Sequence, residues 1–577
     1  MTRSALFALA AFLVAPSASA AVEVDPRTGN ALIEFTDLSI EGALPHFQLV
    51  RSYNSKSVYD GYWGVGWSSN LETRLRVLPE GVAVVHENGG GALTRYHMIK
   101  PDPGALNRMI EQMCVEYLKT GTAAGPAGID AYRQRLTSDA GFREREWMSW
   151  SDRVKATDSF AAGTQLVSAK FGYEYLTRTP TGWVRNRSDD IQENFDLSGK
   201  LVSLEDRHHN TLEIQYSLSG HPLSMLNNLG RKLTLIFSPD GHVDSVHTDA
   251  GISVSYHYDI NHDLIGAVPS NAKGSYYSYD GSSRHLLTRI ENADGKVESL
   301  TYYGLDKNEN VQSHLDTLGR TAHYDYSAPS DLKKWASYVL KSPEGNALVS
   351  RKTEYVYQTN SAGERWLLRQ VDLVDGTRAM TEYNECCVNP VHYNSDVLDI
   401  KFEYDSRGRL IRKYSGNRRY EQAYDSKTQK LVRVLEVDTG EGKDRIVQDI
   451  RYRYDEKGDL AEVRSGDGED FRLVFDSSGR LRTLMDRSEE RTDFGYNEVS
   501  MLLQISQAKR DLAHLVYRER TQPVGVQLSS ISGDSDRARI LVLQYSLLSI
   551  QKLAPQADLS DLLSQLGRTA RLRALPK

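Results

Sequence analysis

An aromatic residue recurs along the centre of the chain with a constant spacing of 21 residues, at Phe195, Tyr216, Phe237, Tyr258 and Tyr279. Between these positions apolar and polar residues alternate, as in 212–216, which is typical of a strand with one buried and one solvated face. A fixed period indicates stacked units that do not bury an apolar face alone. The pattern therefore predicts a repeat array rather than a single globular core.

The fullest copies of the repeat combine an aromatic residue, an Asp and a Gly at fixed offsets. The aromatic residue suits a pleated, half-buried surface, the Asp accepts hydrogen bonds from backbone amides ahead of it, and the Gly adopts the positive φ that closes a short loop. Each copy thus predicts a β-hairpin. The residues that define the repeat are Phe195, Asp196, Gly199, Tyr216, Gly220, Phe237, Gly241, Tyr258, Tyr279, Tyr404, Asp405, Gly408, Tyr454, Asp455, Gly458, Phe475, Asp476, Gly479 and Tyr496.

This pattern resembles the tyrosine–aspartate (YD) repeat of the Rhs family. In that family the hairpins coil into a long sheet that closes as a hollow shell around a passenger polypeptide, and related repeats are linked to carbohydrate binding. About 14 units of this period fit between Phe195 and Tyr496, fewer than a full shell of the family uses. The resemblance therefore implies an all-β, curved array of antiparallel β-hairpins that forms an open or partly closed shell.

The chain departs from the longer members of the family at its C-terminal end. Those proteins end in a self-cleaving segment with an Asp-Pro-x-Gly-Leu-like core, followed by a variable toxin. Here the Asp-Pro pairs are Asp25-Pro26 and Asp102-Pro103, both upstream of the repeats. We therefore expect neither the cleavage element nor a toxin domain.

The first hundred residues predict a signal peptide followed by a β-rich cap. Residues 1–20 carry Arg3, an apolar run and the small-x-small ending of a signal-peptidase site, which predicts export with cleavage near Ala20. Residues 21–100 read as strands. The run at 51–55 and the Gly-x-Gly-Trp turn at 64–67 resemble the N-terminal domain that precedes Rhs repeats, which seals one end of the shell.

Residues 101–167 change to a helical pattern that is not part of the repeat. Leu106, Met109, Ile110, Met113 and Tyr117 share one helix face, and a second helix is expected around Trp147. Two interpretations stay open for this insertion: the apolar stripe packs on the chain's own sheet, or the insertion is a lid or docking arm.

The repeat array is assigned to residues 168–500, with early strands at 171–175 and 182–184. Residues 501–577 form a C-terminal cap, in which Ile540–Leu543 predicts a final strand and Leu559–Leu572 a short helix.

Charge and cysteine content narrow the function classes. Lys and Arg total 70 against 77 Asp and Glu, without a basic stripe, so a nucleic-acid partner is not expected. No stretch after the leader is long and apolar enough to predict a transmembrane span. Cys114, Cys386 and Cys387 are too few for a disulfide framework, and free thiols and a bond remain alternatives.

Motif searches predict no catalytic residue, no metal site and no cofactor. Nucleophile elbows, phosphate loops and zinc signatures are missing from the sequence, and the repeat Asp residues are explained as turn formers. Histidines in neighbouring turns, at His208, His209, His221, His242 and His262, raise the question of a transition metal or a pH sensor. Without an evident acidic ligand at the same step, we interpret them as exposed turn residues.

Three functions remain. The first is an exported, non-enzymatic scaffold that encloses or binds a separately encoded polypeptide. The second is a cell-surface or periplasmic protein that binds carbohydrate through exposed Tyr and Trp. The third is a hydrolase with an unrecognised site, which would need a compact cluster of polar residues with perturbed pKa.

Overall fold

The computed structural model describes residues 22–572, with gaps at 41–44, 46, 79–80, 100–103, 120–124, 155–159, 169–173, 282–284, 362, 386–387, 509, 519–521, 529–532 and 558. The predicted signal peptide, the pair Cys386 and Cys387, and the start of the strand predicted at 171–175 lie outside the described residues.

One antiparallel sheet of 36 strands forms most of the molecule. Each strand pairs with the next one in the sequence. The first half contains β7 (Arg74–Leu78), β8 (Val82–His86), β9 (Leu93–Met98), β10 (Gln165–Ser168), β11 (Tyr175–Thr179), β12 (Gly182–Asn186), β13 (Gln192–Asp196), β14 (Leu201–Glu205), β15 (Thr211–Tyr216), β16 (Pro222–Asn227), β17 (Lys232–Phe237), β18 (Val243–Thr248), β19 (Ser253–Tyr258), β20 (Leu264–Pro269), β21 (Ser275–Tyr279), β22 (Leu287–Glu291), β23 (Val297–Tyr302) and β24 (Val311–Leu315).

The second half begins with longer strands and then returns to the short repeat. It contains β25 (Thr321–Ser330), β26 (Lys333–Lys341), β27 (Ala347–Thr359), β28 (Arg365–Val374), β29 (Thr377–Tyr383), β30 (Pro390–Ser395), β31 (Asp399–Tyr404), β32 (Leu410–Ser415), β33 (Arg418–Tyr424), β34 (Leu431–Asp438), β35 (Arg445–Tyr454), β36 (Leu460–Ser465), β37 (Asp470–Phe475), β38 (Leu481–Met485), β39 (Arg491–Tyr496), β40 (Leu502–Gln507), β41 (Arg510–Arg518) and β42 (Gln522–Leu528).

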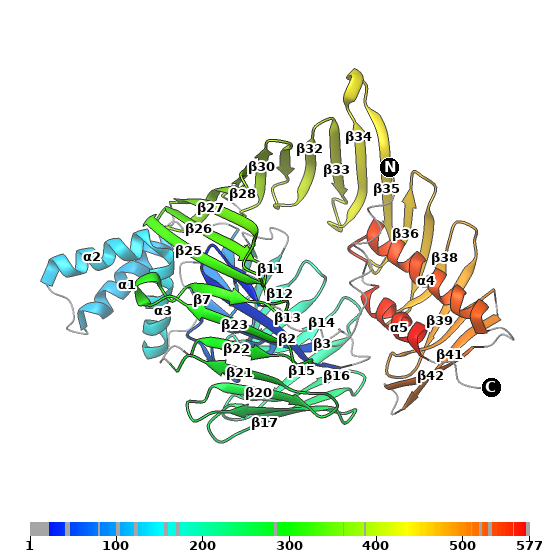
Figure 1. Cartoon of the computed structure of the whole chain (residues 1–577), viewed down its shortest axis with the longest axis horizontal. Helices are drawn as coiled ribbons and strands as arrows, with labels where there is room; N and C mark the ends of the chain where they lie inside the picture. The colour runs from blue at the N-terminus through cyan, green and yellow to red at the C-terminus, as the bar shows by residue number, and fades with distance from the viewer. Residues whose placement is uncertain are drawn as a thin grey trace.

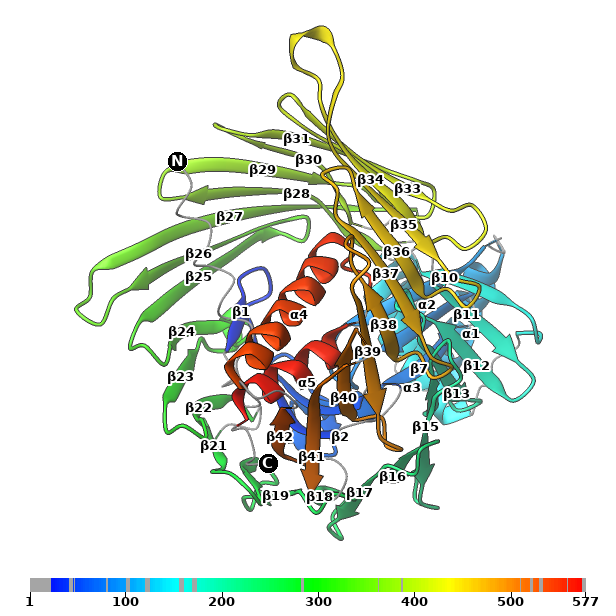
Figure 2. The same cartoon turned by 90° about the vertical axis from the view of Figure 1, so that its right-hand side faces the viewer.

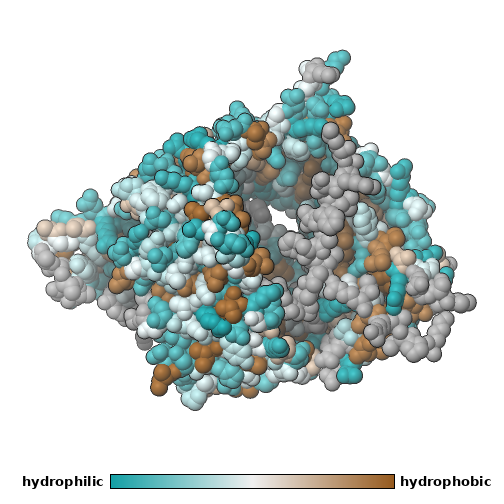
Figure 3. Space-filling view, viewed as in Figure 1, coloured by the Kyte–Doolittle hydropathy of each residue, from teal (hydrophilic) through white to brown (hydrophobic). Residues whose placement is uncertain are grey.

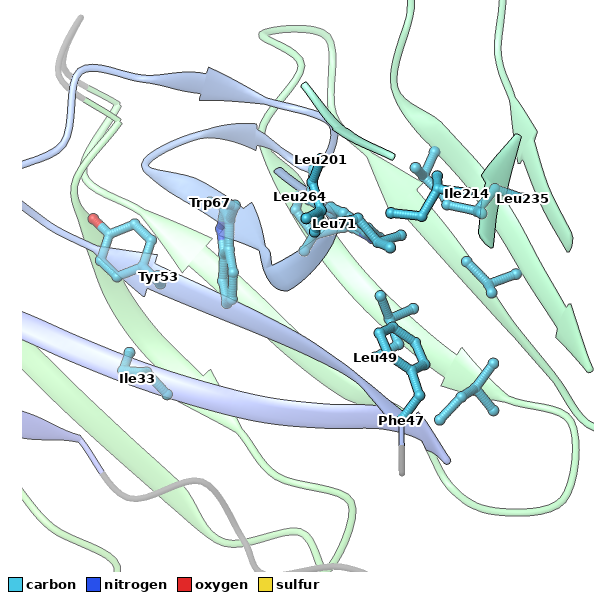
Figure 4. Close-up of a cluster of buried hydrophobic side chains, with 14 of the residues drawn as sticks. Ile33, Phe47, Leu49, Tyr53, Trp67, Leu71, Leu201, Ile214, Leu235 and Leu264 are labelled. Atoms are coloured by element: carbon cyan, nitrogen blue, oxygen red, sulfur yellow. The ribbon is translucent and has the colours of Figure 1, made fainter. Parts of the chain in front are cut away.

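The N-terminal segment packs against the inner face of the first part of this sheet. Its strands are β1 (Glu23–Asp25), β2 (Asn30–Ile40), β3 (Phe47–Asn54) and β6 (Trp67–Ser69), which form a small sheet, and β4 (Asp60–Gly61) with β5 (Gly64–Val65), which form a short ribbon. Ile33, Leu49 and Trp67 are fully buried in one cluster with Leu235 and Leu264 of the long sheet (Figure 4). We call this small sheet the N-terminal plug.

The helical insertion lies on the opposite, outer face. It consists of α1 (Ala105–Lys119), α2 (Gly125–Ser138) and α3 (Ala140–Val154), which project from the sheet in Figure 1. Met109, Ile110 and Met113 of the predicted stripe pack on Leu78 and Val84 of β7 and β8. The prediction that the stripe packs on the chain's own sheet is confirmed, and it does so on the side away from the plug.

The C-terminal segment fills the inner face of the last strands. It forms α4 (Gly533–Leu553) and α5 (Ser560–Arg571), which lie inside the curve of the sheet (Figure 2). Leu543, Leu547 and Ile550 of α4 share a buried cluster with Phe471 and Leu473 of β37. The final strand predicted at Ile540–Leu543 is wrong, because this run lies within α4. A four-residue apolar run does not distinguish a strand from part of a buried helix.

The sheet curves far enough for distant segments to meet. At its start, Arg74 and Lys200 form a single bridge, and the Leu75 N–H donates to the Gly199 carbonyl at 2.8 Å. Later, hairpin turns near Asp459 contact turns near Arg207, so that the arch of β28–β34 spans the gap between two blocks in Figure 1. The predicted all-β curved hairpin array, with an N-terminal β-rich cap and a helical insertion, is confirmed.

Among the described helices, none has the length and apolar character required to cross a membrane.

Candidate functional site

The repeat residues set which face of the sheet points inward. In most units the tyrosine at the end of a strand donates its hydroxyl to a carbonyl of the preceding hairpin: Tyr258 to Val243 at 2.8 Å, and Tyr496 to Leu481 at 2.8 Å. The following Asp caps the turn, since Asp476 Oδ1 accepts the N–H groups of Ser478 and Arg480, each at 3.0 Å. The tyrosine is therefore fixed on the inner face and the Asp in the turn.

Side chains two and four residues before each repeat tyrosine share its face, because strand side chains alternate. In β19 these are Tyr256 and Val254, which are buried against the plug. In β37 they are Leu473 and Phe471, which are buried against α4 and α5. The chain thus covers the inner face of the sheet at both ends with its own segments.

The inner face of β29–β33 is left half-exposed, whereas β26–β28 carry a small buried cluster of Ala336, Tyr355 and Leu367. In β31 the corresponding side chains are Phe402 and Ile400, and both are only partly buried, as is Tyr404. The intervening Lys401 and Glu403 point outward and are exposed. Further half-buried aromatic residues on the inner face of β29, β30 and β33, placed there by strand pairing, are Tyr383, Tyr393, Tyr420 and Tyr424.

Polar groups are interleaved with these rings. Asp372 accepts a hydrogen bond from Thr353 at 2.6 Å, pairs with Arg351 at 2.7 Å, and accepts a second bond from Gln370 at 2.7 Å. On β33 and β34, Arg418 pairs with Glu436 at 3.0 Å. The face is therefore mixed aromatic and charged.

The phenols on this face act as neutral hydrogen-bond donors and acceptors. Burial raises the pKa of Tyr404 above its ordinary value, and the same cause raises the pKa of Tyr383. Tyr404 donates to the Pro390 carbonyl at 2.7 Å. The Tyr404 hydroxyl is thus bonded within the sheet, and the tyrosine rings form the surface that faces the hollow.

The hollow lies between the two filled ends. Figure 3 shows the molecular surface receding beneath the arch of β28–β34. On α4, Leu541, Val542 and Tyr545 are exposed. A separate cavity of about 530 Å³ lies within the C-terminal block, between α4 at Tyr545 and the turns at Gly468 and Arg487. We call the inner face of β26–β34 together with the hollow beneath the arch the central surface.

A seam between hairpin turns joins the two blocks that flank the hollow. Asp459 is 1% exposed, and its Oδ1 accepts from Arg207 Nη2 at 2.8 Å and lies 3.0 Å from His208 Nε2. Asp190 bridges Arg207 at 2.8 Å and Lys430 at 2.7 Å. These contacts join residues about 250 positions apart, so they close the curve through side chains rather than through a strand ladder.

The predicted turn histidines have different surroundings. His209 is exposed and pairs with Glu205, which agrees with the prediction, whereas His208 is buried in the seam. His221 stacks on Phe237 with ring centroids 4.7 Å apart. His242 is buried rather than exposed, and both His242 and His262 approach Asp240, so the expectation of no acidic neighbour is wrong. Asp240 precedes the repeat Gly by one residue, a position the repeat motif does not mark.

Cys114 and Glu72 are buried titratable residues outside the central surface. Cys114 is a buried free thiol whose pKa is raised by burial. Burial raises the pKa of Glu72 to about 7, and this carboxylate accepts hydrogen bonds from the Tyr62 N–H at 2.9 Å and the Ser69 hydroxyl at 3.1 Å. Glu72 therefore supports the fold of the N-terminal segment. The sequence did not mark it, because a lone Glu carries no spacing signal.

Comparisons with known proteins add one domain assignment. Residues 22–95 match the model of a domain of unknown function, DUF6531. This domain spans the N-terminal plug and the start of the long sheet. The comparison with curated protein sequences finds no match.

The solved structures to which the chain aligns include toxin complexes. The chain aligns with the crystal structure of TcdB2-TccC3-TEV at 13% identity and a TM-score of 0.40, over 88% of this chain and 28% of that one. It aligns with the Photorhabdus luminescens Tc holotoxin pore at 11% identity and a TM-score of 0.34, over 87% and 28% of the two chains. This chain spans little more than a quarter of those chains, and the function proposed below rests on its own geometry.

Proposed function

We propose that the chain is an exported, non-enzymatic scaffold of the YD-repeat type that binds a separately encoded polypeptide on its central surface. The observation that carries this proposal is the contrast along one continuous inner face. The two ends are covered by the plug and by α4 with α5, while the inner side chains of β29–β33 between them stay half-exposed. A face that is built like the covered ends but left open is suited to a further segment of polypeptide.

The covered ends indicate how such a face holds polypeptide. Inner phenols make hydrogen bonds to the segments that lie on them: Trp67 donates to Tyr279 at 2.8 Å, and Tyr256 donates to Asp37 at 2.7 Å. At the other end, Tyr452 donates to the Leu553 carbonyl, and Gln556 donates to Tyr454 at 3.1 Å. The central surface offers rings and polar groups at the same repeat positions.

Burial of the half-exposed rings supplies the driving force for binding. Aromatic side chains contribute large contact areas, and the rings of Phe402, Tyr404 and Tyr424 gain contact when a polypeptide covers them. The pairs of Arg351 with Asp372 and of Arg418 with Glu436 offer hydrogen-bonding partners to a backbone or to polar side chains. This combination favours a polypeptide over a purely apolar ligand.

The lack of an enzymatic role is part of the proposal. The repeat Asp residues use their carboxylates to accept backbone N–H groups within turns, as Asp405 does from Arg407 at 2.9 Å and Arg409 at 3.0 Å. These acids are therefore engaged in structure. The proposal of export rests on the leader pattern of residues 1–20.

Co-expression with each polypeptide encoded beside the gene tests the proposal. We expect one of them to copurify in stoichiometric amount and to raise the soluble yield. Phe402→Asp should reduce copurification at least tenfold, because it places a charge on the inner face. Lys401→Asp, one residue away on the outer face, is the matched control and should leave copurification unchanged.

Two results would contradict the proposal. Equal copurification with both variants would place the partner elsewhere on the molecule. The second result is a chain that copurifies with none of the neighbouring polypeptides but is retained on a glycan or peptidoglycan column. This result would favour the carbohydrate-binding alternative.

A further inference from the structure

Two adjacent hairpin turns bring a histidine–histidine–aspartate cluster together at one edge of the sheet. Asp240 and His242 lie in the turn between β17 and β18, and His262 lies in the turn between β19 and β20. Because β18 pairs with β19, the two turns are neighbours. One ligand atom from each of the three side chains lies within 4.8 Å of the others.

The separations between the ligand atoms fit a single tetrahedral ion. His262 Nδ1 lies 2.8 Å from Asp240 Oδ2, and His242 Nδ1 lies 3.3 Å from the same oxygen. Zinc bonds of about 2.0–2.2 Å to nitrogen and oxygen at tetrahedral angles place ligand atoms roughly 3.3 Å apart. The cluster therefore needs little rearrangement to close around an ion.

His242 supplies an independent indication of a ligand. The residue is only 7% exposed, and its buried Nδ1, although 3.3 Å from Asp240 Oδ2, is not aligned for a hydrogen bond with that oxygen or with any other described atom. A buried ring nitrogen without a partner is costly, and a metal ion would engage it. The other ring nitrogen, Nε2, lies 3.6 Å from Asp60 Oδ1 of β4. A carboxylate behind a ligating imidazole is the usual arrangement around bound zinc.

Neighbouring groups hold the ligands in place. The Ser238 hydroxyl donates to Asp240 Oδ1, which leaves Oδ2 directed at the two imidazoles. The two imidazole rings stack with centroids 5.4 Å apart. At Gly64 a Cβ would come within 2.7 Å of the His262 carbonyl oxygen, so glycine permits the close approach of the N-terminal segment.

The backbone at His262 keeps the left-handed conformation of the repeat turn without a glycine. The repeat places Gly at this turn position, as at Gly241, which has a φ of 94°. Here His262 has a φ of 64°, in the left-handed region where glycine is favoured. Ser500, four residues after Tyr496, occupies the same repeat position with a φ of 65°, so the repeat accepts a residue other than glycine here.

We propose that Asp240, His242 and His262 bind one divalent zinc ion, with Asp60 supporting His242 from the N-terminal segment. Two imidazoles and one carboxylate are a ligand set that zinc accepts, with the fourth position left to water. The ion ties two repeat turns to the DUF6531 segment. It acts at the junction of the plug and the sheet, on a part of the molecule separate from the central surface.

Zinc binding to the chelator-treated full chain tests this proposal. The protein is mixed with equimolar ZnSO₄, passed through gel filtration, and its zinc content is measured by mass spectrometry. We expect about one zinc per chain for the wild type. Loading with Co²⁺ should give the visible absorption of a tetrahedral site.

The chain offers a close pair of variants. His262→Gly removes a ligand and restores the residue that the repeat prefers, so the turn is kept. It should lower zinc affinity at least tenfold and abolish the Co²⁺ band. His209→Gly is the control, since His209 also has a positive φ, 62°, and pairs with a carboxylate, but lies outside the cluster. Its zinc content should equal that of the wild type.

A second variant keeps the result interpretable. Asp240→Asn should weaken zinc binding at least tenfold with an unchanged metal-free melting temperature. Equal zinc content in the wild type and His262→Gly, or no retained zinc in the wild type, would overturn the proposal.

Discussion

The seam makes the sharpest prediction about the shell. Arg207 and Asp459 are separated by 252 positions and meet only if the curved sheet returns to its own early turns. We consider a double-mutant cycle of Arg207→Ala and Asp459→Ala. Such a cycle isolates the energy of the pair from the effects of each substitution alone.

The geometry sets the expected magnitude. The Arg207 Nη2 to Asp459 Oδ1 distance is 2.8 Å, and Asp459 is 1% exposed. A pair in an effective dielectric of 20 gains about 4 kcal/mol, and solvent reduces this because the Arg207 side chain is 33% exposed. Arg207 also keeps its bond to Asp190. We therefore expect a coupling energy of about 1–2 kcal/mol.

The single substitution at Asp459 should cost more than the coupling. It leaves both Arg207 and the buried His208 without their shared carboxylate, so we expect a loss of about 2–4 kcal/mol in the free energy of unfolding. Urea denaturation followed by tyrosine fluorescence and circular dichroism measures all four proteins of the cycle. Glu456 lies in the same turn as Asp459 and is exposed, so Arg207→Ala with Glu456→Ala is the control pair and should be additive.

Additive effects in the Arg207 and Asp459 cycle, within about 0.5 kcal/mol, would refute the reasoning. The two turns would then not be in contact, and the sheet would not close in the way described.

Three further predictions test other parts of the structure. Glu72→Gln should be as stable as the wild type near pH 4.5 and more stable by up to about 3 kcal/mol at pH 8. The reason is that the pKa of Glu72 is about 7 in the folded state and 4.5 in the unfolded state, so the wild type loses the stability of its protonated form as pH rises through 7. Equal pH profiles of the two proteins in urea melts would contradict this. Tyr496→Phe should lower the free energy of unfolding by about 1 kcal/mol through loss of the bond to the Leu481 carbonyl, and an unchanged urea midpoint would argue against that bond. Gly199→Ala should lower the free energy of unfolding by more than 2 kcal/mol, because a Cβ at this position would lie 1.9 Å from the Leu75 carbonyl oxygen. Gly251→Ala is the control, since a Cβ there meets open space, and it should lower the free energy of unfolding by about 1 kcal/mol. Equal melting temperatures of the two variants would contradict the contact of β7 with the turn at Gly199.

The local structure of the repeat could be predicted because each of its residues has a local cause. The Asp476 carboxylate accepts N–H groups two and four residues ahead, and Gly479 has a φ of 79°, as the turn requires. The amphipathic stripe at Met109 and Met113 likewise follows from helical spacing. Such features depend on residues that are close in the sequence.

The features that were not predicted depend on contacts between distant residues. The seam joins Arg207 to Asp459, and no periodicity links these two positions. The covering of the inner face by the plug and by α4 follows from the curvature of the whole sheet. The apolar run at 540–543 fits a strand and a buried helix equally well, and only its packing on β37 decides for the helix. The repeat motif does not indicate the cluster at Asp240, because this acid lies at a position that the motif does not mark.

Cysteine accessibility on β31 is the most direct test of whether a bound polypeptide covers the central surface. Phe402→Cys faces inward and Lys401→Cys faces outward on β31, and both should react with a thiol reagent in the chain alone, as read by peptide mass spectrometry. When the copurifying polypeptide is bound, the account predicts at least tenfold slower labelling at position 402 and an unchanged rate at 401. Equal protection at both positions, or unchanged labelling at 402 in a stoichiometric complex, would contradict a scaffold that holds its partner on the central surface.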